Sequence, residues 1–402
     1  MKILKDKDYK VPGFLVSGTR CGIKKKEGAK DLAVIYSEVP ASVAAVFTKN
    51  AVKAAPVLLD MERVKSGKGR AVVINSGNAN ACTGDDGLKK ARAMSRGVAK
   101  ALKVKEEMVY VSSTGVIGEP LPVDKIINAI PELVKNMRED GWKDVEAAIM
   151  TTDAFPKMVG VRTDIGGKDI TIMGIAKGAG MIHPNMATML CYIATDCFIS
   201  PILLDKALRK AVDASFNSIT VDGDTSTNDT VLALANGVAG NKPLTSRSMD
   251  MGKFQDAFNY VTKELAKMIV RDGEGATKVI EINVKGAAGK SDAKKAANAI
   301  GRSNLVKTAF FGNDPNWGRI AAAAGYSGAR VIPERMDIYF NDLQVVKNGL
   351  CVGGDWEVKA RNAMKGVEVK VTVDLNMGKG DATVWASDLT YEYVKINASY
   401  RS

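Results

Sequence analysis

The 402-residue chain contains one histidine, His183, and five cysteines with no C-x-x-C pair among them. A single histidine excludes a histidine-rich metal centre and most catalysis in which histidine is the base. An odd number of cysteines without such a pair is not typical of a disulfide framework or a structural zinc site, and it indicates a reducing compartment. We therefore expect no metal and no bound cofactor.

Long apolar stretches are also missing. Residues 1–8 contain five charged side chains and lack the apolar core of a signal peptide. No window without charges approaches the length of a membrane span. These absences predict a soluble, cytoplasmic protein without a membrane partner.

The chain has an excess of basic residues, with a formal net charge of +12 and a pI near 9.3. Such a charge could attract nucleic acid or acidic ligands. However, the lysines are scattered, the densest run (residues 24–26) is short, and few aromatic residues lie among them. The pattern favours a solvated basic surface and no nucleic-acid partner, and a nucleic-acid-binding protein stays a minor alternative.

The composition is that of a globular protein, with 46% apolar and 25% charged residues. At this length, two domains or one large layered domain are expected. Apolar, β-branched segments alternate with amphipathic ones, and this alternation predicts a layered α/β architecture. The expected strands are residues 31–47, 71–75, 108–111, 159–163, 170–175, 279–284 and 367–373. The expected helices are residues 86–102, 123–137, 142–149, 201–216, 253–270 and 293–306, with a further helix from about 312 to 323.

Three polar segments interrupt this pattern. Residues 76–84 and 112–118 are small, polar turns that each follow an expected strand. Residues 220–230 carry three aspartates, but they lack the spacing and the terminal glutamate of a calcium-binding loop. The C-terminal third is expected to be mostly strands, and its last residues are unusually rich in polar and aromatic groups for a frayed end.

A glycine-rich bend near the middle of the chain leads to Thr188. The chain has no Walker loop, no G-x-S-x-G elbow and no dinucleotide fingerprint, so a threonine nucleophile is the remaining candidate. Such a nucleophile needs a base, which could be His183 or the α-amine of Thr188 itself, if the chain is cut before it. The hydroxyl of Thr188 could make this cut by attacking the carbonyl of Ala187, a small residue.

The sequence Gly-Ala-Gly-Met-Ile-His-Pro-Asn-Met-Ala-Thr-Met-Leu (residues 178–190) resembles the self-cleavage motif of the ornithine acetyltransferases, the glutamate N-acetyltransferases of the ArgJ family. Other blocks match this family in the same order, so the resemblance extends over nearly the whole chain. These blocks are residues 48–57, 76–84, 113–118, 150–153, 272–278, 314–319 and 397–402.

The resemblance implies a layered α/β sandwich of the ornithine acetyltransferase and DmpA-like type, self-cleaved between Ala187 and Thr188. Residues 1–187 would form an α chain and residues 188–402 a β chain, although the cut would not be a true domain boundary. The two chains would stay associated as an α2β2 heterotetramer. Thr188 would accept the acetyl group of N2-acetylornithine and pass it to L-glutamate in a ping-pong cycle.

The resemblance also implies roles for individual residues. Thr114 and Gly115 would form the oxyanion hole, while His183 would be a structural or entrance residue and not the base. The residues expected to bind substrate are Thr151 or Thr152, Lys177, Thr188, Glu274, Asn397 and Ser402. Acetyl-CoA is a possible co-substrate, but no residue of the sequence decides whether the protein uses it as an acetyl donor.

Alternatives remain open at this point. Lys177 could be a surface charge, Glu274 could cap the long helix before it, and Ser402 could belong to a disordered tail. A self-processing amidohydrolase or aminopeptidase with a threonine nucleophile is the second hypothesis for the activity. It shares the predicted cut and differs in passing the acyl group to water.

Overall fold

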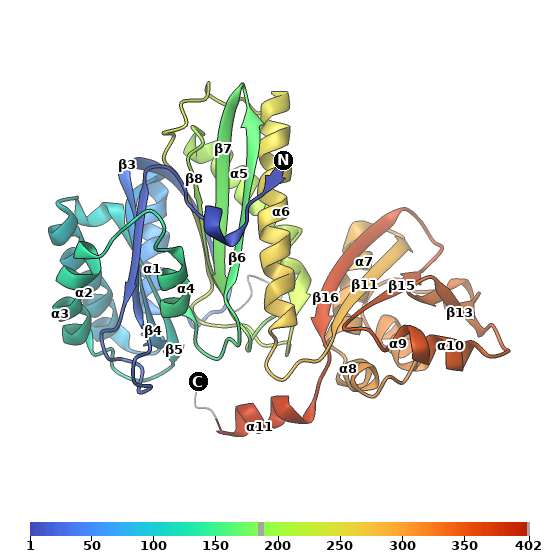
Figure 1. Cartoon of the computed structure of the whole chain (residues 1–402). Coiled ribbons are helices and arrows are strands. Elements are labelled where there is room, and N and C mark those ends of the chain that lie inside the picture. The colour runs from blue at the N-terminus through green and yellow to red at the C-terminus, as the bar shows by residue number, and fades with distance from the viewer. Residues whose placement is uncertain (184–188, 400–402) are drawn as a thin grey trace.

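The structure is a computed structural model that describes residues 1–183 and 189–399. The chain forms a larger body and then a smaller lobe, which lies to the right in Figure 1. The C-terminal helix α11 (Tyr391–Ser399) leaves the smaller lobe and runs back beneath the larger body. The last described residues therefore lie far from the lobe that precedes them in sequence.

Within the described residues, the larger body contains a nine-stranded sheet in the order β1-β6-β7-β8-β10-β3-β4-β5, with β2 paired to β3. β7 precedes the bond between residues 187 and 188, β8 follows it, and the two strands pair antiparallel. One sheet thus contains chain from both sides of this bond. The strands are β1 (Lys2–Ile3), β2 (Phe14–Thr19), β3 (Leu32–Phe47), β4 (Lys68–Asn78), β5 (Val109–Val116), β6 (Lys157–Ile165), β7 (Lys168–Lys177), β8 (Leu190–Thr195) and β10 (Thr230–Ala235).

The long strand β3 belongs to two layers. Its register with β4 shifts between Tyr36 and Ala41. Before the shift, Val34 contributes to a core on one outer face of the sheet, and after the shift Val46 contributes to a core on the other outer face. Residues on the inner side of β3, such as Ile35 and Val43, share a third core. The sheet therefore folds over on itself, with apolar side chains between its halves.

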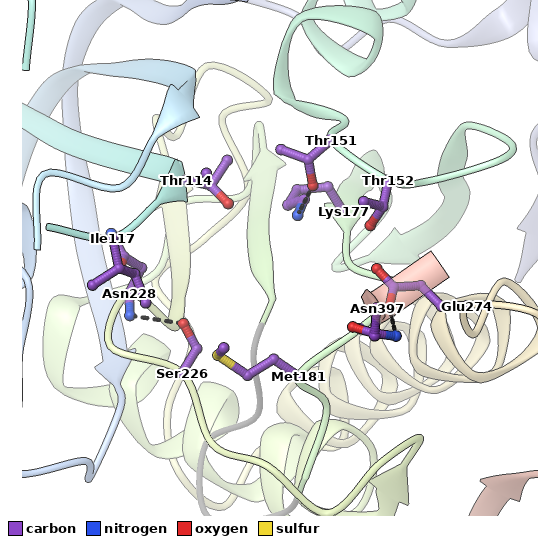
Figure 2. A pocket seen from close by; sticks show the side chains of 12 residues that line it. Thr114, Ile117, Thr151, Thr152, Lys177, Met181, Ser226, Asn228, Glu274 and Asn397 are labelled. Carbon is purple, nitrogen blue, oxygen red and sulfur yellow. Dashed lines mark hydrogen bonds between the residues drawn. The ribbon is translucent and has the colours of Figure 1, made fainter. Parts of the chain in front are cut away.

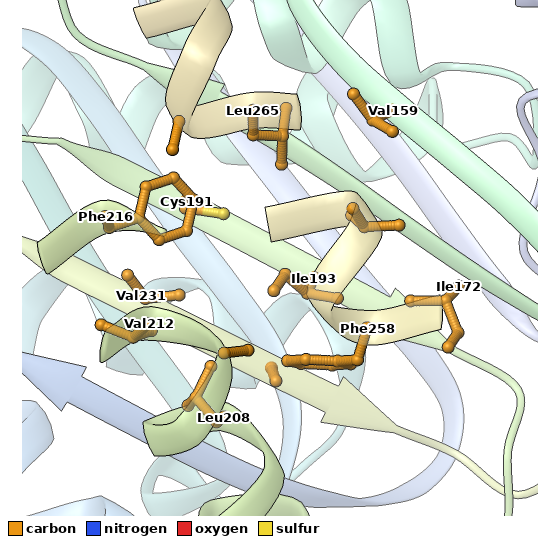
Figure 3. Packing of buried hydrophobic residues seen from close by; sticks show 14 of the residues in the cluster. Val159, Ile172, Cys191, Ile193, Leu208, Val212, Phe216, Val231, Phe258 and Leu265 are labelled. Carbon is orange, nitrogen blue, oxygen red and sulfur yellow. The ribbon is translucent and has the colours of Figure 1, made fainter. Parts of the chain in front are cut away.

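Helices cover both outer faces of the folded sheet. Met94 of α2 and Ile126 of α3 pack against β3, β4 and β5. Leu208 of α5 and Phe258 of α6 pack on the opposite face, as Figure 3 shows. The result is a four-layered α-β-β-α arrangement, which confirms the predicted layered α/β sandwich. The outer helices are α1 (Ala55–Arg63), α2 (Gly84–Leu102), α3 (Val123–Lys135), α5 (Pro201–Asp213) and α6 (Met249–Arg271), whereas α4 (Trp142–Ile149) packs Trp142 and Ile149 into the core between the two halves of the sheet.

The smaller lobe has a sheet covered by helices on one face only. Within the described residues its seven strands follow the order β14-β13-β12-β15-β11-β16-β9. Val369, Val371 and Val373 of β15 point into the core under the helices, and this confirms the alternation predicted for residues 367–373. The strands are β9 (Ile219–Thr220), β11 (Val279–Ala287), β12 (Asp337–Phe340), β13 (Leu343–Lys347), β14 (Leu350–Cys351), β15 (Glu368–Asp374) and β16 (Gly380–Ser387).

Three sequence-based predictions are wrong. The helix expected at residues 293–306 is two helices, because the side chain of Ser303 accepts a hydrogen bond from Val306 N and starts a new helix. The turn expected at residues 112–118 is instead mostly strand, since β5 stays paired with β4 up to Val116. The C-terminal third is not mostly strands, because it contains two helices, α10 (Trp356–Ala363) and α11, in addition to the expected ones. The other helices of this third are α7 (Lys290–Arg302), α8 (Asn304–Phe311) and α9 (Trp317–Gly325).

Among the helices that the structure describes, none combines the length and the apolar composition that a membrane crossing requires.

Replacing Phe258 by alanine is expected to lower the free energy of unfolding by about 3–5 kcal/mol, because it leaves a cavity in a fully buried core. The ring of Phe258 has no exposed surface and stacks on Phe254, with 5.5 Å between ring centroids. Urea unfolding followed by circular dichroism measures the change. Leu350→Ala is the control: Leu350 is 73% exposed, so a change within about 0.5 kcal/mol is expected. Equal losses in the two variants would contradict the role of this core.

Candidate active site

A pocket opens where β5 and β7 end and where the C-terminal helix returns to the larger body. Figure 2 shows side chains from these three places around a common space. Most of the residues that the sequence singled out are found together here. The lining residues are Thr114, Gly115, Ile117, Thr151, Thr152, Lys177, Gly180, Met181, Ser226, Asn228, Glu274 and Asn397.

Thr114 and Gly115 lie side by side near the end of β5. Gly115 pairs with Gly77 of β4 and has a φ of +132°. A Cβ at position 115 would lie 2.3 Å from the carbonyl carbon of Gly77, so only glycine allows this close approach. A threonine hydroxyl and the adjacent backbone N–H group therefore both lie at the pocket. Two neighbouring donors are what a developing oxyanion requires.

The polar segment between β9 and β10 braces this strand end. Asn228 Nδ2 donates hydrogen bonds to the carbonyl oxygens of Ala79 (2.6 Å) and Ser113 (2.8 Å). Asn228 N donates to Ser226 Oγ (3.1 Å). The sequence does not single out Ser226 or Asn228, because the only known motif that this segment resembles is a calcium-binding loop, whose spacing it lacks. The one signal that could have found them is a run of Ser, Thr, Asn and Asp between two strands.

Lys177 is the last residue of β7 and only 6% exposed. Its Nζ donates a hydrogen bond to Thr151 Oγ1 at 2.7 Å and lies 3.8 Å from Asp153 Oδ2. The surface-charge alternative for Lys177 is therefore wrong. Thr151 and Thr152 both line the pocket, and Thr151 is the one bonded to the ammonium group.

A buried ionic cluster lies behind Lys177. The fully buried Lys157 pairs with Asp153 at 2.7 Å and with Asp272. Burial alone would raise the pKa of Asp153, but Lys177 and Lys157 outweigh it and hold that pKa below its ordinary value. Asp153 thus stays ionised, and it also accepts a hydrogen bond from Gly178 N at 2.6 Å. The cluster fixes the direction in which the chain leaves β7.

Glu274 reaches the pocket from the segment after α6. Its backbone N donates to Ala179 O at 2.9 Å, and its carboxylate lies against Gly180. A Cβ at position 180 would come within 2.5 Å of this carboxylate, so glycine makes room for it. Asn397 Nδ2 of α11 donates to Glu274 Oε2 at 2.9 Å. α6 ends at Arg271 with Asp272 as its C-cap, which leaves Glu274 directed at the pocket and not capping that helix.

Ala187, Thr188 and Ser402 lie outside the described residues. The next described residue after Thr188 is Met189, whose N donates to Asp229 Oδ1 at 3.0 Å. Met189 lines a second, smaller cavity together with Thr114 and Lys177. The covalent neighbour of Thr188 is therefore close to the donors described above.

His183 lines a separate groove, between the larger body and the smaller lobe. Burial, together with the positive charge of Arg302, lowers the pKa of His183 to about 4, so its ring is neutral at pH 7. Within the described residues, no cluster of three or more histidine, cysteine or acidic side chains is arranged to hold a metal ion.

Comparisons with known proteins cover the whole chain. The profile of the ArgJ family matches residues 15–402. The "Arginine biosynthesis bifunctional protein ArgJ" of Geobacter sulfurreducens is 54% identical over 392 residues, which are 98% of the present chain and 100% of its own. The protein of the same name from Caldanaerobacter subterraneus subsp. tengcongensis is 50% identical, with 100% of both chains covered.

A solved structure agrees with this assignment. It is that of "Arginine biosynthesis bifunctional protein argJ" from Bacillus halodurans, which is 44% identical and superimposes with a TM-score of 0.51. The match covers 52% of the present chain and 98% of the solved chain. Because the family profile and these relatives extend over nearly the full length, the chain belongs to the ArgJ family.

Proposed function

We propose that this pocket transfers an acetyl group from N2-acetylornithine to L-glutamate. ArgJ proteins are acyltransferases of arginine biosynthesis, so the class of reaction follows from the family. The observation that carries the site assignment is the convergence of Thr114, Gly115, Lys177 and Glu274 on one pocket. Two adjacent donors suit an oxyanion, and a cation and a carboxylate suit the two charged groups of acetylornithine.

The reaction would begin with processing of the chain. The hydroxyl of Thr188 attacks the carbonyl of Ala187, the peptide C–N bond breaks, and water opens the resulting ester. This cut frees an α-amine whose ordinary pKa of about 7.7–8.0 lets it accept the hydroxyl proton near neutral pH. His183 is not needed as the base. The match of the solved relative to about half of the present chain and to 98% of its own chain supports a two-chain product.

In the transfer itself, Thr188 Oγ attacks the acetyl carbonyl of acetylornithine. Negative charge then develops on the carbonyl oxygen, where the Thr114 hydroxyl and the Gly115 N–H stabilise it. The C–N bond breaks, ornithine leaves with the proton held by the α-amine, and an acetyl ester remains on Thr188. The amine of glutamate attacks this ester and leaves as N-acetylglutamate.

Charged residues of the pocket would orient both substrates. Lys177 offers a cation to a substrate carboxylate, and its bond to Thr151 and pairing with Asp153 fix its position. Glu274 offers a carboxylate to the side-chain ammonium of acetylornithine, with Asn397 bonded to it. Thr152 and Ser402 are part of the same proposal. Fixed groups lower the entropy cost of aligning the acetyl carbonyl with the nucleophile.

We also propose that the two chains remain associated after the cut and assemble as an α2β2 heterotetramer. Support for the first part comes from the sheet, in which β8 and β10 lie between β7 and β3. β8 and β10 would belong to the β chain, and β7 and β3 to the α chain. The two chains could separate only if the hydrogen bonds between β7 and β8 and those between β10 and β3 all broke. Acetyl-CoA is proposed as a second acetyl donor, since the curated relatives are named bifunctional.

The processed protein, mixed with N2-acetylornithine and L-glutamate, is expected to form N-acetylglutamate and ornithine in equal amounts. Liquid chromatography with mass detection follows both products. The runner-up, a self-processing hydrolase, predicts free acetate and no N-acetylglutamate. That outcome would contradict acetyl transfer to glutamate, but it would not contradict self-cleavage of the chain.

Thr188→Ala is expected to give one intact chain with no transfer activity, because the variant lacks the hydroxyl that both steps need. A denaturing gel separates the intact chain from fragments of residues 1–187 and 188–402. Thr308→Ala, on the exposed face of α8, should be cut and active. An uncut wild type, or a variant that is both cut and active, would disprove the mechanism.

Thr114→Ala is expected to slow transfer by about 10²–10³ in kcat, the usual effect of losing one oxyanion donor. Self-cleavage should slow as well if the same donors serve both steps. Time courses of chain cutting and of N-acetylglutamate formation measure the two rates, with Thr308→Ala as the control. Unchanged rates in Thr114→Ala would remove this residue from the oxyanion hole.

A further inference from the structure

A groove of about 700 Å³ lies between α5 of the larger body and α7 and α9 of the smaller lobe. None of its residues lines the pocket described above. Its volume falls within the roughly 300–1,000 Å³ of small-molecule sites. The lining residues are Lys49, His183, Asp213, Asn217, Lys294, Lys295, Asn298, Ala299, Arg302, Tyr326 and Ser327.

The groove has cations without partners. Lys294 pairs with Asp213 at 2.7 Å, and Lys295 pairs with Asp292 at 3.6 Å. Among the residues that the structure describes, no carboxylate lies within ion-pair distance of Lys49 or Arg302. Asp213 is the one acidic residue in the lining, so the groove carries a net positive charge suited to phosphate groups.

Two buried polar atoms of the groove also lack partners. They are Nδ1 of His183 and Oδ1 of Asn298, neither of which has a hydrogen bond to any described residue. Buried polar atoms are usually bonded, and each exception calls for an explanation. A ligand with hydrogen-bonding groups of its own would satisfy both atoms.

An aromatic ring completes the groove. Tyr326 directly follows α9 and is 66% exposed, which is high for a side chain of its size and apolar surface. Exposed aromatic rings are platforms on which nucleobases stack. A nucleoside phosphate requires three kinds of group. It needs cations for its phosphates, polar atoms without partners for the edge of its base and an exposed ring for the face of its base.

The groove and the pocket are neighbours. Met181 lines the pocket and His183 lines the groove, and their Cα atoms are at most about 7 Å apart because only one residue lies between them. The pocket itself offers only about 90 Å³. That is too small for a donor that carries a nucleotide, whose nucleotide part must therefore lie outside the pocket.

We propose that the groove binds the nucleoside phosphate part of an acyl thioester donor, coenzyme A, while the acetyl group enters the pocket. This inference rests on the proposed acetyl transfer through Thr188. Its Oγ attacks the thioester carbonyl, the C–S bond breaks, and coenzyme A leaves as the thiol with the proton from the hydroxyl. The acetyl ester that remains is the one formed from acetylornithine.

The test uses the processed wild-type enzyme and the variants Arg302→Gln and Tyr326→Ala. Each is expected to raise the KM for acetyl-CoA about tenfold or more, the effect of one lost charge-assisted bond or one lost stacking contact. The KM for S-acetylpantetheine, which has no nucleotide, should stay unchanged in both variants. Lys370→Gln, an exposed lysine on β15, removes one charge far from the groove and is the matched control.

Calorimetric titration with coenzyme A, ATP and inorganic phosphate identifies the ligand. Tighter binding of coenzyme A than of the other two, weakened by Arg302→Gln and not by Lys370→Gln, supports the inference. Equal binding of ATP, or an unchanged KM for acetyl-CoA in both groove variants, overturns it. Acetyl transfer from acetylornithine to glutamate is measured in parallel. This distinguishes a groove that does not bind coenzyme A from an enzyme that does not transfer acetyl groups at all.

Discussion

The pocket depends on one buried ionic cluster, in which Lys157 lies between Asp153 and Asp272. These residues come from the start of β6, from the segment after α4 and from the end of α6. A buried ion pair adds little net stability, because desolvation offsets the Coulomb attraction, but losing one partner is costly. We therefore interpret the cluster as fixing geometry: it holds three segments together and, through Asp153, sets the position of Lys177.

Local patterns predicted much of the fold. The helix at residues 142–149 and the strands at residues 159–163 and 170–175 are confirmed, since each depends on periodicity within a few residues. Predictions failed where a distant partner decides the structure. Thr114 is in a strand because β4 pairs with it, although small polar residues there are typical of a turn. The amphipathic pattern at residues 293–306 likewise predicted one continuous helix, although a second helix begins after Ser303.

The candidate site could be predicted only through the family resemblance. Lys177, Glu274 and Asn397 are far apart in sequence, and no spacing rule brings them into one pocket. Asn228 was missed because its bonds to Ala79 and Ser113 cross more than 100 residues. Side chains that act by bracing a neighbour leave no periodic signal. The roles of Thr188 and Ser402 stay predictions, since neither is among the described residues.

The return of α11 to the pocket has a practical consequence for anyone who handles the protein. Asn397 contacts Glu274 at the pocket, and any residue appended after position 402 is joined to it by a chain of at most about 20 Å. An affinity tag on the C-terminus would thus start within about 20 Å of this pocket. The N-terminus is better suited, because Met1 is exposed and β1 lies at the far edge of the large sheet.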